Sequence, residues 1–290
     1  MQVYDFSTLY TSLDLKDVEN TLSDLCDLLF SPRHKYICIN PYKAFFSTKK
    51  YNGYTCFDKA LFKKAISFIL NNTFVAFAGF VLKQTRGIPM GGSCSSPTAD
   101  LFLSFKEFNF MKRLLKEKKF NLARLLSNNS RYVDDLNIIN YQLFNNRSKE
   151  IYPDVLQLER CGDNEKNVVY LDVRVKVSNE GVTTSLYNKT DDFDFPVVSY
   201  TFPESNIPKQ LGYNVFYGQV LRYSAIFSLR QEFVSKTAKL FRILNNRGYG
   251  HNMLIKTIKK VFKNNNHILG FKISSEVLAE LQYHLSIIDI

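Results

Sequence analysis

The chain has 290 residues, of which 45% are hydrophobic and 22% charged, a balance typical of a folded protein rather than a disordered one. No apolar run reaches the ~18 residues that a membrane helix needs, and the N-terminus MQVYDFSTLY lacks the basic and apolar regions of a signal peptide. These features argue against a membrane-spanning or secreted protein and predict an intracellular one, in the nucleus or the cytoplasm.

The first half of the chain mixes predicted helices and strands. Apolar residues spaced by three and four predict helices over residues 14–30 and 57–71. An aromatic and β-branched run over 73–82 predicts a short hairpin. A long helix is expected over 97–126, with Pro97 in its first turn and the preceding serines as caps.

The second half begins with strands and ends with helices. Residues 131–140 are predicted to form two short strands that meet at an acidic turn. The alternating segment 168–177, the turn SNEG and the strand VTTSLY predict a hairpin. After a proline-containing loop, helices are expected over 214–246, 250–264 and 274–287.

These elements predict an α+β fold in two parts, with a boundary near residue 190. In residues 1–190, an antiparallel sheet carries acidic residues on one face, and the helices over 14–30 and 97–126 cover the other face. Residues 191–290 form a mainly helical and basic part.

The net charge of +11 is concentrated in the second part. Between Asn206 and Asn266 there are eleven Lys or Arg residues and one acid, Glu232, which gives a local net charge of +10. Aromatic residues are interspersed with these cations, so the segment has groups for both the bases and the phosphates of a nucleic acid. A solvated helix surface is the alternative interpretation.

The cysteines indicate neither a disulfide framework nor a zinc site. All five stand at irregular spacings without a CxxC pair, at positions Cys26, Cys38, Cys56, Cys94 and Cys161. The pattern predicts reduced and partly buried thiols.

Three acids are the candidate catalytic residues. Asp134 and Asp135 are adjacent in an otherwise apolar run, where two carboxylates are unfavourable unless a cation such as Mg²⁺ compensates their charge. A solvated hairpin turn, in which Asp is common, is the alternative for this pair. Asp5 ends a short apolar stretch and belongs either to the same metal site or to the N-cap of a following helix.

A glycine-rich segment, GIPMGGSCSSP, lies between these acids and opens the long predicted helix. Glycines allow a backbone to approach a ligand closely, although such a loop is weak support by itself. In order and spacing, DFSTLY, GIPMGGSCSSP and YVDD together resemble the palm motifs A, B and C of reverse transcriptases.

The RY-DD box, the later LDV strand and the segment SLYNKTDDFDFPVVSYTFPESNIP are similar to those of Penelope-like retroelements. This resemblance covers roughly Tyr4 to Phe233 and is looser after Lys189. It implies an RNA-directed DNA polymerase with a palm over 1–190, part of the fingers side within 31–86, and a thumb-like region over 191–290.

The resemblance implies roles at the reaction centre. Asp5, Asp134 and Asp135 would be catalytic and, with the backbone carbonyl of Phe6, would ligate two Mg²⁺ ions, for which Mn²⁺ can substitute. Tyr10 would exclude a 2′-hydroxyl and so select deoxynucleotides, unless it is only a core aromatic. The remaining dNTP-binding residues would be Met90, which replaces the Gln of many reverse transcriptases, Gly91 and Lys166.

The implied partners are an RNA template, a DNA primer or RNA–DNA hybrid, and dNTPs, without a membrane. The implied nucleic-acid contacts are Tyr132, Asp172, Lys189, Arg222, Lys236, Lys239, Arg242, Lys256, Lys259 and Lys260. For Asp172 a plain strand-edge acid is the alternative.

Two other functions stay open. Asp5 is preceded by only four residues, so the fingers segment that normally precedes motif A is expected to be missing, which favours a truncated, non-catalytic nucleic-acid-binding remnant. An RNA-dependent RNA polymerase is disfavoured, because Tyr10 would obstruct the 2′-hydroxyl of a ribonucleotide.

Overall fold

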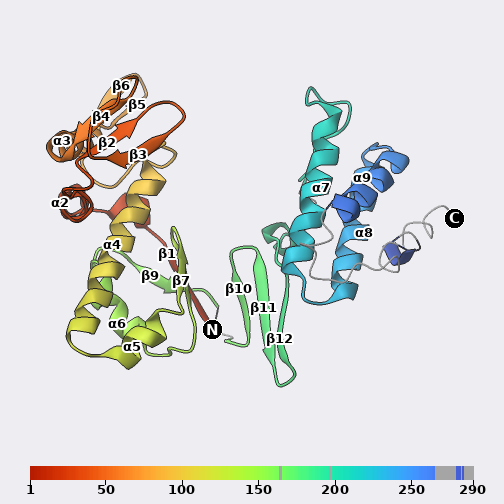
Figure 1. The fold of residues 1–290 in the computed structure, drawn as a ribbon. Helices are drawn as coiled ribbons and strands as arrows, with labels where there is room; N and C mark the ends of the chain where they lie inside the picture. Colours follow the sequence, from red (N-terminus) through yellow and green to blue (C-terminus); the bar gives the residue numbers. More distant parts are fainter. Residues whose placement is uncertain (163–164, 196, 265–278, 282, 284–290) are drawn as a thin grey trace. The chain divides into compact units, whose positions relative to one another are not determined.

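The computed structural model describes residues 1–162, 165–195, 197–264, 279–281 and 283 (Figure 1). They form two compact units, Met1–Asp163 and Asn164–Ile290, each with its own hydrophobic core. The division falls earlier than the boundary expected near residue 190. The reason is that the strands expected to close the first part pack instead with helices of the second unit.

A four-stranded antiparallel sheet in the order β7-β8-β1-β9 is the centre of the first unit. Its strands are β1 (Gln2–Phe6), β7 (Ser130–Tyr132), β8 (Asp135–Ile138) and β9 (Leu158–Arg160). Because side chains alternate along a strand, Tyr4, Phe6 and Leu136 point into the core and Asp5 lies on the opposite face. The two short strands expected over 131–140, with their acidic turn, are confirmed.

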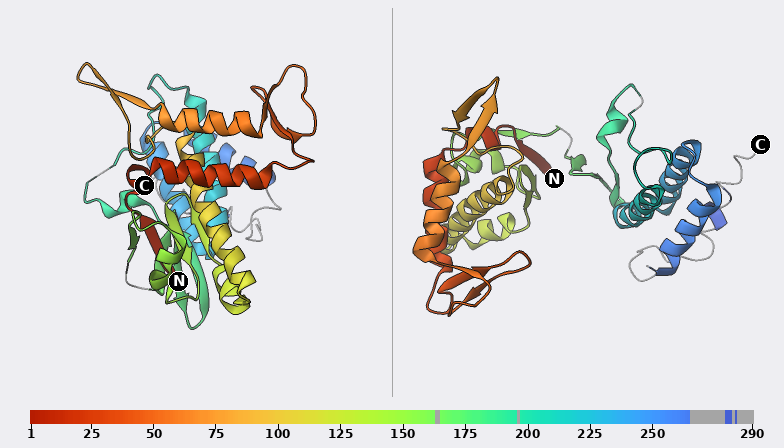
Figure 2. Two further views of the ribbon diagram at one scale, coloured as in Figure 1. Left: turned by 90° about the vertical axis from the view of Figure 1, so that its left-hand side faces the viewer. Right: turned by 90° about the horizontal axis from the view of Figure 1, so that it is seen from above.

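Helices bury the apolar face of this sheet. The core joins sheet residues to α4 (Ser95–Lys116), α5 (Phe120–Leu126) and α6 (Phe144–Ile151). The predicted helices over 14–30 and 57–71 are confirmed as α2 (Leu15–Leu29) and α3 (Lys59–Asn71), which run side by side (Figure 2). A single turn, α1 (Leu9–Ser12), links β1 to α2.

The long helix expected over 97–126 is interrupted. It ends at Lys116, and Lys118 adopts φ 58°, a left-handed conformation that no α-helix continues, before α5 begins. Its start also differs from the expectation. Cys94 occupies the N-cap position without a side-chain hydrogen bond, and the serines expected as caps lie inside the helix or before the N-cap.

Two small sheets complete the first unit. A three-stranded antiparallel sheet has the order β3-β2-β4, and β5 and β6 form the hairpin that was expected over 73–82. The bounds are β2 (Tyr36–Ile39), β3 (Ala44–Ser47), β4 (Thr55–Asp58), β5 (Phe74–Phe77) and β6 (Phe80–Lys83).

The second unit combines a three-stranded sheet with a helical layer. The strands are β10 (Asn167–Tyr170), β11 (Val173–Ser178) and β12 (Gly181–Leu186), and a short 3-10 turn, η1, spans Lys189–Asp192. The helices are α7 (Lys209–Ile226), α8 (Arg230–Asn246) and α9 (His251–Asn264).

Two predicted elements of this unit need correction, and a third lies largely outside the residues that the structure describes. The segment 168–177 is two strands, because Leu171 adopts φ 55° and turns the chain. The helix over 214–246 is divided at 227–229 into α7 and α8. The helix expected over 274–287 lies largely outside the described residues, of which 279–281 and 283 are helical.

The helices of the second unit pack closely. Gly212 of α7 lies against the Tyr249 ring, and a Cβ at this position would overlap that ring. In α9, Leu254, Ile258 and Val261 are buried in the core, while the lysines between them are exposed. Among the described residues, no helix combines the length and the apolar character needed to cross a membrane.

Candidate active site

Three carboxylates form a row across the first sheet. Asp5 stands directly opposite Asp135 on β8 and Glu159 on β9. Directly opposed residues of antiparallel strands share a face, with Cβ atoms ~4.5–5.5 Å apart, and like charges in this position repel. The register therefore brings three carboxylates onto one face of the sheet. The alternative role of Asp5 as a helix cap is excluded, because Asp5 lies within β1 and Thr8 is the N-cap of α1.

Asp134 lies in the tight turn between β7 and β8, beside this row. The Phe6 N–H donates a hydrogen bond to the Asp134 carbonyl, with an N···O distance of 3.2 Å, so the turn is held against the residue that follows Asp5. Val133 adopts φ 54° in the same turn. A β-branched residue in this region is an outlier, and such strain is typical of functional sites.

The glycine-rich loop is attached to the segment that follows Asp5. Gly87 N–H donates to the Leu13 carbonyl at 2.9 Å, and Ile88 N–H donates to the Tyr10 carbonyl at 2.6 Å. Gly87 has φ 75°, and a Cβ there would lie 2.5 Å from the Tyr10 carbonyl oxygen. Only glycine permits this approach, which explains the glycine at the start of the motif.

The other predicted residues of this unit are accessible. Met90 is 70% exposed and Gly91, with φ 85°, has open space at its Cα. Tyr132 is 62% exposed and stands opposite Asp135. The Tyr10 ring is half-buried. One part of the ring packs against the core, and the rest is accessible to solvent.

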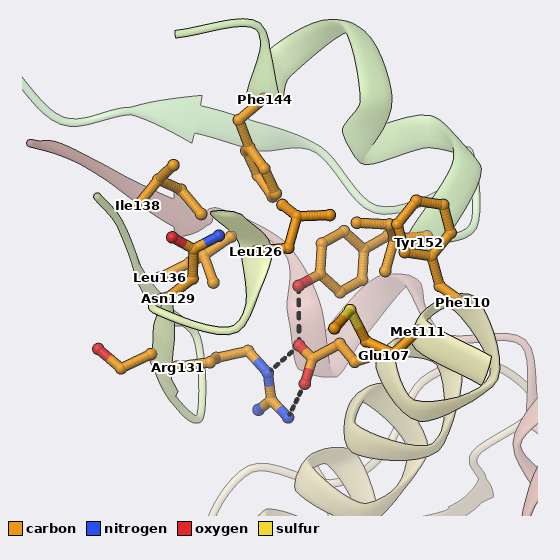
Figure 3. A pocket seen from close by; sticks show the side chains of 12 residues that line it. Glu107, Phe110, Met111, Leu126, Asn129, Arg131, Leu136, Ile138, Phe144 and Tyr152 are labelled. Carbon is orange, nitrogen blue, oxygen red and sulfur yellow. Dashed lines mark hydrogen bonds and ion pairs between the residues drawn. The ribbon is translucent and has the colours of Figure 1, made fainter. Parts of the chain in front are cut away.

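An ionic network centred on the buried Arg131 supports the acidic turn, and it was not among the residues predicted from the sequence; its contacts with Glu107 and Tyr152 are drawn in Figure 3. The Arg131 side chain is 5% exposed; its Nε lies 2.6 Å from Glu107 Oε1, and its Nη1 lies 2.8 Å from Asp100 Oδ1. The same Nη1 donates to the Val133 carbonyl at 3.0 Å. Arg131 therefore links α4 directly to the strained turn that carries Asp134.

Tyr152 extends this network to β1. Its hydroxyl donates to Glu107 Oε1 at 2.7 Å, and its ring packs edge-on against Phe6 with centroids 4.9 Å apart. Burial raises the pKa of Tyr152 well above its usual value, and the negative charge of Glu107 adds to this effect. Burial lowers the pKa of Arg131, but Glu107 and Asp100 outweigh it, so the net pKa is raised.

The network borders a cavity of ≈ 110 Å³ whose other walls are mainly apolar (Figure 3). Leu136 and Ile138 of β8 line it, together with Phe144 of α6. The sequence could have indicated this network, because Arg131 is a cation next to an apolar strand and a buried cation needs polar or acidic partners.

The remaining predicted residues belong to the second unit. Lys166 and Lys189 are exposed, just before β10 and in η1. Asp172 lies in the turn after β10 and accepts a hydrogen bond from Arg222 Nε at 2.6 Å, so these two predicted contacts pair with each other. Asp172 therefore stands in the turn at the edge of both strands, and its pairing with Arg222 leaves both interpretations of this acid open.

The predicted cations of α8 and α9 are mostly accessible. Lys236 is half-buried. The others are exposed: Lys239, Arg242, Lys256, Lys259 and Lys260. Their exposure agrees with a binding surface as well as with a solvated one.

The described side chains alone do not form a complete metal-binding site. Within the described ranges, no three or more His, Cys, Asp or Glu side chains form a preformed metal-binding group. Mg²⁺ in nucleotide sites is commonly held by one or two carboxylates together with substrate phosphates. Asp5, Asp134 and the Phe6 carbonyl offer hard oxygen donors of the kind that this mode of binding uses.

No protein-family model matches the chain, and no curated protein matches its sequence. Its fold is similar to that of a telomerase chain from Candida albicans, in a structure solved with the TWJ fragment of telomeric RNA. The TM-score is 0.61 at 12% identity, over 98% of this chain and 47% of the telomerase chain. The chain thus spans about half the length of that protein. At this identity the similarity concerns the fold alone: the chain has an α+β fold that resembles the matched part of the telomerase chain.

Proposed function

We propose that the chain carries the palm and thumb-like region of a retroelement reverse transcriptase, related to the Penelope-like type. It adds deoxynucleotides to a primer 3′-hydroxyl on an RNA template. One observation carries the proposal: Asp5 pairs in register with Asp135, next to a strained turn that presents Asp134. The order of the three sequence motifs and the fold similarity to telomerase support it.

Each element has a defined task in this proposal. Asp5, Asp134 and the Phe6 carbonyl would hold two Mg²⁺ ions, with Asp135 as an outer or weaker ligand. Such ions would supply Lewis acidity toward the 3′-hydroxyl and counter-charge for the departing pyrophosphate. Arg131 keeps the acidic turn in place, and the Tyr10 ring forms a wall against a 2′-hydroxyl.

The alternative is a nucleic-acid-binding protein without catalysis. It is favoured by one observation, the exposed cations of α8 and α9, which bind phosphates whether or not the acids hold metal. The two functions differ in a single measurable property, the extension of a primer.

The test is primer extension by the whole chain on an RNA template with dNTPs and Mg²⁺. We expect the wild type to extend the primer, and Asp134→Asn to reduce extension by about 10³-fold or more. That loss corresponds to ~4 kcal/mol of transition-state stabilisation. Primer–template affinity should stay unchanged, because the carboxylate makes no phosphate contact. Asp24→Asn, an exposed change of the same chemistry on α2, is the matched control and should retain full activity.

Three outcomes decide between the functions. Extension by the wild type and by Asp24→Asn, but not by Asp134→Asn, supports the polymerase. Binding without extension in every variant establishes the nucleic-acid-binding alternative. Extension that survives Asp134→Asn would show that the metal acids lie elsewhere.

A further inference from the structure

Two cysteines that are distant in the sequence face each other in the small sheet β3-β2-β4. Cys38 on β2 and Cys56 on β4 are directly opposite in antiparallel register, and their Sγ atoms are 2.7 Å apart. A disulfide bond is ~2.05 Å long and joins Cβ atoms ~3.5–4.5 Å apart, a spacing that opposed strand residues nearly reach. Both residues are free thiols in the structure.

The surroundings hold the two sulfur atoms in this position. Cys38 is fully buried, and its thiol donates to the Lys49 carbonyl at 3.8 Å. The Tyr51 N–H donates to Cys56 Sγ at 3.4 Å. The rings of Tyr51 and Tyr54 pack edge-on against Phe45, which fixes the loop that covers the pair.

We propose that Cys38 and Cys56 form a modification site, a thiol pair that a peroxide oxidises to an intrachain disulfide. Cys56 is the sulfur that meets the oxidant, because it is partly exposed whereas Cys38 is buried. Burial, followed by the hydrogen bond and charge of Cys56, raises the pKa of the Cys38 thiol. A raised pKa keeps Cys38 protonated, which together with its burial disfavours it as the sulfur that meets the oxidant in the first step.

The reaction balances with one molecule of peroxide. Hydrogen peroxide oxidises the Cys56 thiol to a sulfenic acid and is itself reduced to water. The Cys38 sulfur then attacks the sulfenic sulfur, the S–S bond forms, and the hydroxyl group leaves with the Cys38 proton as a second water. The pair loses two electrons and two protons, and a thiol reductant reverses the change.

The disulfide joins two strands at the entrance to α3. Cys56 precedes Asp58 by two residues, and the Asp58 side chain caps α3 by accepting from the Leu61 N–H at 2.8 Å. The bond closes a loop between residues separated by 18 positions, which restricts the unfolded chain. We expect oxidation to raise the melting temperature of the chain by about 5–10 °C.

The experiment uses the whole chain with Cys94→Ser and Cys161→Ser, which remove the two exposed thiols. The protein is treated with one equivalent of hydrogen peroxide, alkylated and digested with trypsin. Trypsin cuts after Lys49 and Lys50, between the two cysteines. A cross-linked pair of peptides, lost after reduction, is the expected product. The melting temperature should rise on oxidation and return on reduction, and Cys56→Ser should show neither effect.

Two results would overturn the proposal. In one, Cys38 and Cys56 are alkylated equally before and after peroxide. In the other, Cys56 is oxidised without any cross-link to Cys38. The protein with Cys94→Ser and Cys161→Ser keeps both Cys38 and Cys56. Comparing its oxidised and reduced forms therefore tests the proposal even if Cys56→Ser fails to fold. None of these measurements depends on polymerase activity.

Discussion

Tyr10 combines a packing contact with an accessible ring, and its two proposed roles can be separated. Removing the ring with Tyr10→Ala should lower the preference for dNTPs over rNTPs by about tenfold or more, ~1.4 kcal/mol, because the wall under the sugar is lost. The same change should destabilise the first unit by about 1–3 kcal/mol, since part of the ring is buried. The measurement is kcat/KM for both sugars, alongside a denaturant titration.

Tyr10→Phe is the matched control, because it keeps the ring and removes only the hydroxyl. It should discriminate between the sugars as the wild type does. A Tyr10→Ala protein that loses stability but discriminates normally would identify Tyr10 as a core residue only. The gate would then have to lie elsewhere in the site.

The sequence indicated the candidate catalytic acids but not the residues that surround and position them. Asp5, Asp134 and Asp135 could be proposed because charge inside an apolar run is unfavourable and therefore conspicuous. Glu159 and Tyr152 could not, because their importance comes from cross-strand register and a ring contact. No local pattern in the sequence specifies either of these features.

At the scale of elements, Tyr152 ties α4 to β1 through Glu107, and its loss should be measurable in stability. Tyr152→Phe keeps the ring against Phe6 but removes the hydroxyl, and should lower the free energy of unfolding by about 1–2 kcal/mol at neutral pH. Circular dichroism during urea titration gives this value. Tyr42→Phe, at a ring 95% exposed, is the control and should change nothing.

The hydrogen bond between Tyr152 and Glu107 also predicts that stability depends on pH. The pKa of Tyr152 is raised in the folded state, so the folded protein holds this proton more tightly than the unfolded chain does. Its stabilisation is complete below the unfolded pKa of ~10 and is lost as the pH rises toward the folded value. Wild-type stability should therefore fall more steeply above about pH 10 than that of Tyr152→Phe. Parallel curves would contradict the assignment.

Element types were predictable where periodicity was strong, and element breaks were not. Helix α2 and the hairpin β5–β6 follow directly from their patterns. The breaks at Lys118 and Leu171 occur at positive φ in residues that ordinarily favour regular structure, so no glycine marks them. The apolar residues of 168–173 run through the break at Leu171, whereas at Lys118 the charged run Lys116–Lys119 interrupts the apolar spacing.

At the scale of the whole molecule, the two compact units divide after Asp163, earlier in the chain than the boundary near residue 190 that was expected from the sequence. The strands β10–β12 resemble a continuation of the first sheet in composition, but they pack against α7, and Thr184 N–H donates to Ser228 Oγ at 2.9 Å. Strand patterns specify that a strand forms and which face is apolar, but they do not specify the partner. The concentration of charge, in contrast, was readable from composition, because it does not depend on pairing.

That charge leads to a prediction about the basic helix α9. Lys256, Lys259 and Lys260 are exposed on one helix, opposite its buried residues, and no carboxylate lies among them in the sequence. Each phosphate contact releases counterions, so the affinity for an RNA–DNA hybrid should fall with salt, with a log–log slope of about −0.7 to −0.9 per contact. Changing all three lysines to Ala should flatten the slope by roughly two to three units without altering sequence preference, because phosphate contacts carry no base information.

A salt titration by fluorescence anisotropy measures these slopes for two hybrids of different sequence. The matched control changes three exposed lysines of the first unit, Lys16, Lys64 and Lys116, to Ala. This control removes the same net charge. A general effect of charge would therefore reduce the slope equally in both variants, whereas a local binding surface would reduce the slope only in the α9 variant. If the α9 variant keeps the wild-type slope, this face of the helix is simply solvated. The thumb-like role of the second unit would then rest on the sequence resemblance alone.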